Sequence, residues 1–477
     1  MVPDDEGGGL MRADLLTDAV DGLDEALAAV DGFDEVLVAG LLRPQPAQAD
    51  GLFALADAVA GSPLASRVAE AAEKAAAGAA GEDHFIALAA ARTALLGSVH
   101  DALTVRMEEA VGRPRAEEDA DGAGSPGDGD EQAAHLHVAA REWLCNLARA
   151  GWRGIDHELV AGAAPVVSAM LPDPALRRLA TLLDGFAAEL AASCPGATLE
   201  RVPVRRWADL WSRALLLTVP GAAHAPATAE VSGRLLPLGV DLQEHATAVQ
   251  AQVHAVFEPA DGGASRLVRA SVSAPKPDTV VGAGLWQLLR PRMSLLAAVS
   301  EGRAMELDAM PVTAEGDLIW DDARARTGEP VEIFTTARVA LPTAAAFATA
   351  PLDRHPARIA VPVLVEGYDV EEEDGAVAFR IAGQRLPVDT GRIPAAGPLT
   401  PEVVASSGAC IGLLRWDAGE FLLQPLAVER RAGRRTVAVH AGAWAGGTTD
   451  KAGVRAEKAA TDAVKVLRER AGKLLRK

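Results

Sequence analysis

The sequence predicts an α+β protein with an α-helical N-terminal half, a mainly antiparallel β C-terminal half and a basic helix at the C-terminus. Before Pro220 the apolar residues recur every three or four positions, as on one face of a helix; after it they recur at every second position, as on one face of a strand. Alanine dominates the composition and aromatic residues make up only 4% of it, which favours closely packed helices with small core residues.

The chain has 477 residues, which exceeds the size that one hydrophobic core usually supports, so we expect several domains. Charge is uneven along it: residues 1–131 hold 27 of the 66 acidic residues against 8 basic ones, whereas 451–477 hold 9 basic against 3 acidic residues. Periodicity and charge together predict an acidic helical domain (1–111), a flexible acidic linker (112–132), a second helical domain (133–219), a β-rich domain with inserted helices (220–447) and a basic C-terminal helix (448–477).

The first segment begins with a helical stripe of apolar residues from Leu15 to Val30. The motif DGLDE at 21–25 returns as DGFDE at 31–35, and ten residues are not a whole number of helical turns. We therefore expect a second helix that starts with Asp31 as its N-cap, followed by helices at 63–77 and 83–111.

Residues 112–132 are rich in Pro, Gly and acidic residues and contain no large aliphatic or aromatic residue, so burial cannot offset the entropy of ordering them. The helical pattern then resumes and includes Trp207 and Trp211, which lie four apart and so share one helix face. They are candidates for contact with a partner, although core packing is the favoured interpretation.

The β pattern is clearest at 248–257, where Gln250, Gln252 and His254 alternate with apolar residues. A Pro- and Gly-containing turn and a second alternating run follow, which predicts a hairpin. The row of Gln250, Gln252 and His254 is a candidate polar binding surface, and a solvated sheet face is the simpler interpretation. Further strands are expected at 331–341, 357–368, 376–381, 410–416, 421–428 and 434–440, and helices at 284–301 and 400–407.

Several catalytic and cofactor motifs are missing from the sequence. Gly472-Lys473 lacks the upstream glycine of a phosphate loop, and Gln287 stands where a dinucleotide fingerprint needs its third glycine. No Gly-x-Ser-x-Gly motif occurs. The three cysteines are too scattered for a disulfide framework, and no His and Cys spacing completes a zinc site. We therefore expect neither a cofactor nor a metal.

The C-terminal helix is the strongest candidate for an interaction. Its basic residues Lys465, Arg468, Lys473 and Arg476 flank a narrow, Ala-rich apolar stripe. Three interpretations stay open: the helix docks on the acidic helices of its own chain, it binds an acidic partner or a membrane surface, or it contacts nucleic acid. The stripe suits membrane insertion poorly, and aromatic residues for base stacking are missing.

The acidic opening of the chain has no apolar signal-peptide region, and no window approaches about 18 uninterrupted apolar residues. We expect a cytoplasmic protein without membrane insertion.

Four segments carry a resemblance to a known family: RWADLW at 206–211, LLPLGVD at 235–241, LLRWD at 413–417 and LRERAG at 467–472. They resemble an uncharacterised actinobacterial family encoded beside MoxR-type AAA+ ATPases, von Willebrand A-domain proteins and SWIM zinc-finger proteins. The resemblance covers most of 134–477 and carries over no site residue. It implies protein partners from that ATPase and A-domain system.

Charge polarity and the missing catalytic sets together predict a non-enzymatic scaffold or adaptor protein. One alternative is an enzyme of another type, with a site at the boundary of the helical and β halves that uses His245, His254 or nearby carboxylates. The other alternative is nucleic-acid binding through the basic C-terminal helix.

Overall fold

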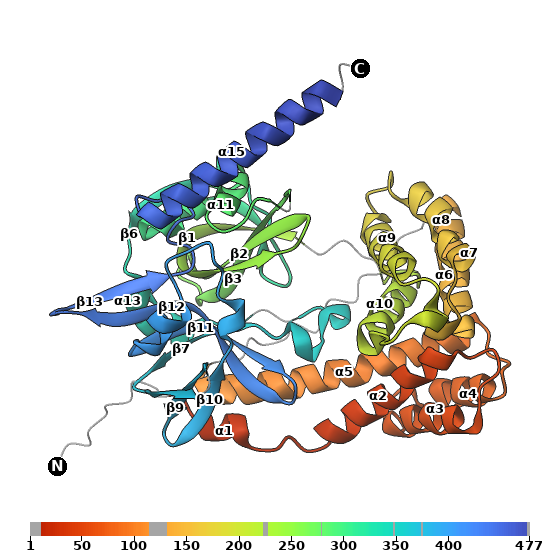
Figure 1. Ribbon diagram of the computed structural model, residues 1–477. Helices are drawn as coiled ribbons and strands as arrows, with labels where there is room; N and C mark the ends of the chain where they lie inside the picture. Colours follow the sequence, from red (N-terminus) through yellow and green to blue (C-terminus); the bar gives the residue numbers. More distant parts are fainter. Residues whose placement is uncertain are drawn as a thin grey trace, which may run out of the picture.

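A computed structural model describes residues 11–113, 131–222, 228–277, 279–346, 349–373 and 375–474. It confirms the predicted fold class: helices fill most of the N-terminal half, a mainly antiparallel β region follows, and a long helix ends the described chain (Figure 1). Most of the predicted linker, 114–130, lies outside the described residues.

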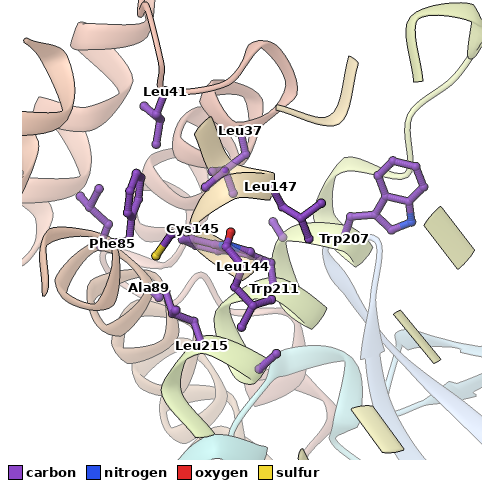
Figure 2. Packing of buried hydrophobic residues seen from close by; sticks show 14 of the residues in the cluster. Leu37, Leu41, Phe85, Ala89, Leu144, Cys145, Leu147, Trp207, Trp211 and Leu215 are labelled. Carbon is purple, nitrogen blue, oxygen red and sulfur yellow. The ribbon is translucent and has the colours of Figure 1, made fainter. Parts of the chain in front are cut away.

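The helical half packs around one apolar core to which the residues before and after the predicted linker both contribute (Figure 2). Phe85, Trp211 and Leu144 meet there from three different helices. The helices are α1 (Ala13–Thr17), α2 (Leu23–Ala39), α3 (Pro46–Ala58), α4 (Ala65–Ala76), α5 (Glu82–Val111), α6 (Glu131–Ala150), α7 (His157–Ala161), α8 (Ala163–Met170), α9 (Arg177–Ala192) and α10 (Val204–Leu217).

The expected helix start at Asp31 is wrong, because α2 runs through that residue without a break. Val30, Phe33 and Leu37 are buried at helical spacing and hold the helix in one piece, while Asp31 is exposed. The chain instead breaks before α2, where Gly22 adopts a left-handed conformation with φ 76°.

Helix α5 connects the two halves of the molecule. Its first half, including Phe85 and Leu88, belongs to the helical core, and its second half, including Leu103 and Met107, packs with residues of the β half. The helix is long and apolar enough to span a membrane, with a mean hydropathy of 1.2, yet 56% of that window is buried inside the protein, as in a core helix.

Five strands of the first sheet close into a ring, and the sixth, β6, pairs with β4 outside it. The strands of this sheet follow the order β1-β2-β3-β5-β4-β6, and a further pairing of β1 with β4 joins the two sides. Helices α11 (Gly284–Leu289) and α12 (Leu295–Glu301) contribute to its core. The strands are β1 (Thr228–Glu244), β2 (Ala248–Pro259), β3 (Arg266–Pro275), β4 (Arg303–Thr313), β5 (Asp317–Leu318) and β6 (Ala325–Pro330).

The second sheet has the order β7-β11-β12-β10-β9-β8, with β13 paired to β12, and it is antiparallel except for the pairing of β10 with β12. It contacts the first sheet closely: a Cβ atom on Gly239 of β1 would lie 2.7 Å from Cβ of Leu426 in β12. The strands are β7 (Val361–Glu366), β8 (Asp369–Glu373), β9 (Ala376–Ile381), β10 (Gln384–Val388), β11 (Ala409–Asp417), β12 (Glu420–Ala432) and β13 (Arg435–His440).

The hairpin of β2 and β3 and the strands at 376–381, 410–416, 421–428 and 434–440 are confirmed. The strand expected at 331–341 is wrong, because that segment forms helix α13 (Ile333–Val339). Glu332 begins it by accepting hydrogen bonds from the backbone N–H groups of Phe334 and Thr335. The helix expected at 284–301 is split into α11 and α12 around Pro291.

Candidate functional site

The basic C-terminal helix, α15 (Lys451–Leu474), packs on α11 through its first half. Ala460 is buried directly over Gly284, where a Cβ atom would overlap with the Ala460 methyl group. Arg290 donates to Glu457 at 2.7 Å, and Gln287 donates to the Glu457 carbonyl at 3.0 Å. A tight small-residue contact and an ion pair therefore fix the first half of α15 to the β half.

The second half of α15 projects away from the rest of the molecule (Figure 1). Lys465, Arg468 and Lys473 are exposed there, and no described carboxylate pairs with them; Arg476 lies outside the described residues. Val466 and Leu467 are also exposed, with 45% and 38% of their surface accessible. We call residues 465–473 the distal segment of α15; it presents cations and two apolar side chains to solvent.

The first of the three interpretations of this helix is that it docks on the acidic helices of its own chain. The described residues do not show such a contact. Helix α15 packs on α11 of the β half, and in Figure 1 it lies at the opposite side of the molecule from α1 to α4. The distal segment of α15 is therefore left open to other molecules, whereas several carboxylates of the helical half, including Asp31 and Asp34, pair with arginines of the same half.

Trp207 and Trp211 share a helix face as expected, but both belong to the buried core of the helical half, and Figure 2 shows Trp211 next to Leu144. Trp207 packs edge-on against Trp152 with 5.9 Å between ring centroids, and Trp211 donates its indole N–H to the Leu144 carbonyl at 2.9 Å. Both rings are completely buried, which corrects their placement among the binding residues and agrees with the favoured core interpretation.

The predicted polar row on β2 extends over neighbouring strands. Strand pairing places Gln252 opposite Asp241 of β1 and Ser271 of β3, and Gln252 donates to the Ser271 hydroxyl at 3.1 Å. Gln250 and Gln252 are half-buried, whereas His254 is only 1% exposed. A solvated face is therefore wrong for His254, which lies where the second sheet covers the first.

A buried polar network joins the two sheets next to His254. The carboxylate of Asp241 accepts from Gln424 at 2.7 Å and from Gln243 at 3.0 Å, and Arg415 donates to the Gln424 side-chain oxygen at 3.0 Å. Burial lowers the pKa of His254 to about 4, assisted by nearby arginines and opposed by Asp241. Sequence reasoning missed Asp241 and Gln424 because they lie 183 positions apart.

A cavity of about 390 Å³ opens beside this network. His245, Asp241 and Arg392 line it, so one of the two histidines named for an enzyme site reaches the cavity and His254 does not. The residues that line it include no Ser, Thr, Cys or Lys, so its ionisable side chains are the carboxylates of Asp241 and Glu244, His245 and Arg392.

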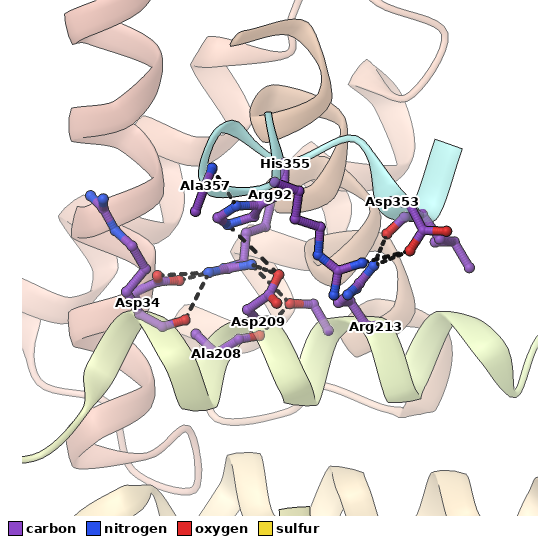
Figure 3. Close-up of polar contacts among 12 residues, drawn as sticks. Asp34, Arg92, Ala208, Asp209, Arg213, Asp353, His355 and Ala357 are labelled. Carbon is purple, nitrogen blue, oxygen red and sulfur yellow. Dashed lines mark hydrogen bonds and ion pairs between the residues drawn. The ribbon is translucent and has the colours of Figure 1, made fainter. Parts of the chain in front are cut away.

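The boundary of the helical and β halves holds a cluster of internal ion pairs (Figure 3). Arg92 donates to both oxygens of Asp34, at 2.6 and 2.9 Å, and Arg213 donates to Asp353 at 2.6 Å. His355 lies 3.8 Å from Asp209. The contacts of Arg213 and His355 tie α10 to the segment that precedes β7, whereas the Arg92 pair joins α5 to α2 within the helical half.

Burial sets the protonation tendencies in this cluster. It raises the pKa of Asp34 to about 6 despite the Arg92 guanidinium, and it lowers the pKa of His355 to about 4.

Neither a reactive thiol nor a metal site is found among the described residues. Burial raises the pKa of the Cys145 thiol in α6 to about 12, which makes this thiol a poor nucleophile. Among the residues that the structure describes, no three His, Cys, Asp or Glu side chains gather as a metal site.

No family model, no curated protein and no solved structure matches the chain.

Proposed function

We propose that this protein is a non-enzymatic scaffold or adaptor that binds an acidic protein partner through the distal segment of α15. The observation that carries the proposal is the exposure of this segment: its four cations, Lys465, Arg468, Arg470 and Lys473, face solvent on a helix that is anchored at its other end. Glu469 is the one acidic residue within the segment.

The shape of the segment supports a protein partner. A helix fixed at one end presents its side chains in a preformed arrangement, which lowers the ordering cost of binding. Each exposed ion pair contributes little, about 0–1 kcal/mol, so a partner needs several carboxylates together with a pocket for an apolar anchor. Val466 and Leu467 are the anchors that the segment offers.

The resemblance of this chain to the actinobacterial family suggests which partners to look for. They are MoxR-type AAA+ ATPases, von Willebrand A-domain proteins and SWIM zinc-finger proteins. An adaptor in such a system would hold one of them on α15 while its acidic helical half remains available to a second molecule.

The cavity beside His245 favours a second candidate function, an enzyme acting on a small polar molecule. Asp241 and Glu244 supply carboxylates there and His245 a titratable ring, the side chains that general acid–base chemistry uses. A screen of small metabolites by thermal shift tests this candidate. A ligand whose stabilising effect is lost in His245→Ala would support it, and absence of any stabilising ligand would count against it.

The scaffold proposal is tested by affinity capture from native cells with the full chain. The test variant carries Lys465→Glu, Arg468→Glu and Lys473→Glu. The control carries Lys451→Glu, Arg455→Glu and Lys458→Glu, three cations that are also exposed, on the first half of the same helix. Both variants change the net charge by the same amount, so a difference between them reports position.

We expect the unchanged chain and the control to retain an ATPase, A-domain or zinc-finger partner that the test variant loses. Recovery of none of these three classes by the unchanged chain, or equal recovery by both variants, would contradict the proposal.

A further inference from the structure

The β12–β13 hairpin extends from the second sheet as a two-stranded ribbon, visible at the left of Figure 1. Its strands pair from Ala427 with His440 to Ala432 with Arg435, and Gly433 and Arg434 form the two-residue turn. Gly433 has φ 64°, the left-handed conformation that such tight turns require. No other described strand pairs with β13, so the ribbon has one free edge.

The tip of this ribbon is strongly basic. Arg430, Arg431, Arg434 and Arg435 fall within six residues, and residues 430–440 contain no Asp or Glu. None of the four arginines has an ion-pair partner among the described residues. The nearest carboxylate along the chain, Glu429, already accepts from Arg338 at 2.8 Å.

The fold does not need these charges. Arg431, Arg434 and Arg435 are exposed, so they contribute little to packing, and four like charges in and beside one turn repel each other. Arg430 is half-buried and its Nε finds no acceptor. A cluster of like charges that destabilises the isolated molecule is typical of a surface that binds an anionic partner.

We propose that the tip of the β12–β13 ribbon binds the phosphate backbone of double-stranded DNA. A two-stranded ribbon fits the major groove of B-form DNA, and the guanidinium group matches a phosphate with two parallel hydrogen bonds. The site is separate from α15, for which contact with nucleic acid is one of three interpretations of the sequence.

Other anionic partners fit the ribbon less well. Residues 430–440 include no Phe, Tyr or Trp on which the bases of a single strand would stack, and the single imidazole ring, His440, lies at the far end from the tip. Val437 is the one exposed large apolar residue of the described ribbon, which gives a membrane little to bury. The formal net charge of −20 does not prevent local binding, because charges beyond about 10 Å are largely screened at about 0.1 M salt.

The test is the fluorescence anisotropy of a labelled random-sequence DNA duplex titrated with the full chain between about 50 and 200 mM salt. The test variant carries Arg431→Gln, Arg434→Gln and Arg435→Gln. The control carries Lys451→Gln, Arg455→Gln and Lys458→Gln, which removes the same number of exposed cations elsewhere. Circular dichroism melts verify that both variants fold.

We expect the unchanged chain and the control to bind the duplex, and the ribbon variant to bind at least about tenfold more weakly with a salt slope smaller by about 2–3. Replacement of the same three arginines by Lys should retain most of the salt slope, because the charge is kept. No duplex binding by the unchanged chain at about 50 mM salt, or equal loss in variant and control, would overturn the proposal. Stronger retention on anionic vesicles or single strands than on duplex would overturn it as well.

Discussion

At the scale of single residues, Asp241 shows how the two sheets are joined. Both of its oxygens accept from amide groups, of Gln424 and Gln243, in a buried site. Asp241→Asn replaces one carboxylate oxygen with an NH2 group, which would face the amide N–H donor of Gln424 or Gln243. We therefore expect a loss of about 1–3 kcal/mol in the free energy of unfolding.

Urea unfolding measures this loss. Asp261→Asn is the matched control, because Asp261 lies in an exposed turn where the amide oxygen of Asn can still accept from the Gly263 N–H. The control should change the free energy of unfolding by no more than about 0.5 kcal/mol. Equal stability of Asp241→Asn and the unchanged chain would show that the network does not hold the sheets together.

His254 makes stability depend on pH. Burial keeps its ring neutral in the folded protein with a pKa of about 4, whereas the unfolded chain takes up a proton below its ordinary value of 6.5. The stabilising contribution is therefore complete above pH 6.5 and is lost as the pH falls towards 4. Glutamine does not titrate. Between pH 6.5 and 4 the free energy of unfolding of the His254→Gln variant should therefore fall less than that of the unchanged chain, by up to about 3 kcal/mol.

Unfolding free energies of both chains at several pH values between 4 and 7 provide the measurement. Their difference isolates His254 from the other buried groups, including Asp34, whose raised pKa acts in the opposite sense. Parallel pH profiles of the two chains would contradict the assigned burial effect.

At the scale of elements, the position of α15 depends on Gly284. A methyl group there would overlap with Ala460, so Gly284→Ala should loosen the first half of α15, at a cost of about 1–3 kcal/mol. Hydrogen exchange of residues 451–464 should speed up. The double variant Gly284→Ala and Ala460→Gly should restore part of the protection, because it removes the opposing methyl group.

Gly185→Ala in α9 is the control for this substitution. Its Cβ atom would meet nothing within 4 Å, so it should leave α15 unchanged and stabilise α9 by up to about 1 kcal/mol. Unaltered exchange of residues 451–464 in Gly284→Ala would show that the contact does not fix α15.

The element predictions succeeded where periodicity was strong and local. The first half of β2 alternates clearly, and α5 and α10 carry long helical stripes. The element predictions were wrong where a local feature of the sequence conflicted with the structure that formed. Glu332 caps a helix in an apolar run that looks like a strand, and a repeated acidic motif at Asp31 suggested a break in a helix that is continuous.

At the scale of the whole molecule, the sequence predicted the two structural classes and their order but not the contacts between them. The cluster of Arg92, Asp209 and His355 brings together positions far apart in the chain, and no local pattern indicates such pairs. For the same reason, the cavity beside Asp241 was not predicted, although His245 was named. Independent folding of the five predicted segments stays a prediction.

The charge polarity of the chain was visible in the sequence, and the structure adds how the basic end is presented. Because α15 packs on α11, its cations are not neutralised by the acidic helices of the same molecule. An uncompensated cluster is expected to attract an acidic partner from solution and to do so less strongly as salt increases.

The measurement that tests this account most directly is the affinity of the full chain for a purified partner recovered by capture, determined at about 50 and 200 mM salt. We predict that affinity falls with salt, and that replacing Lys465, Arg468 and Lys473 by Glu abolishes binding while the control on the first half of α15 retains it. An affinity that is indifferent to salt and to all three replacements would contradict a docking role for the distal segment.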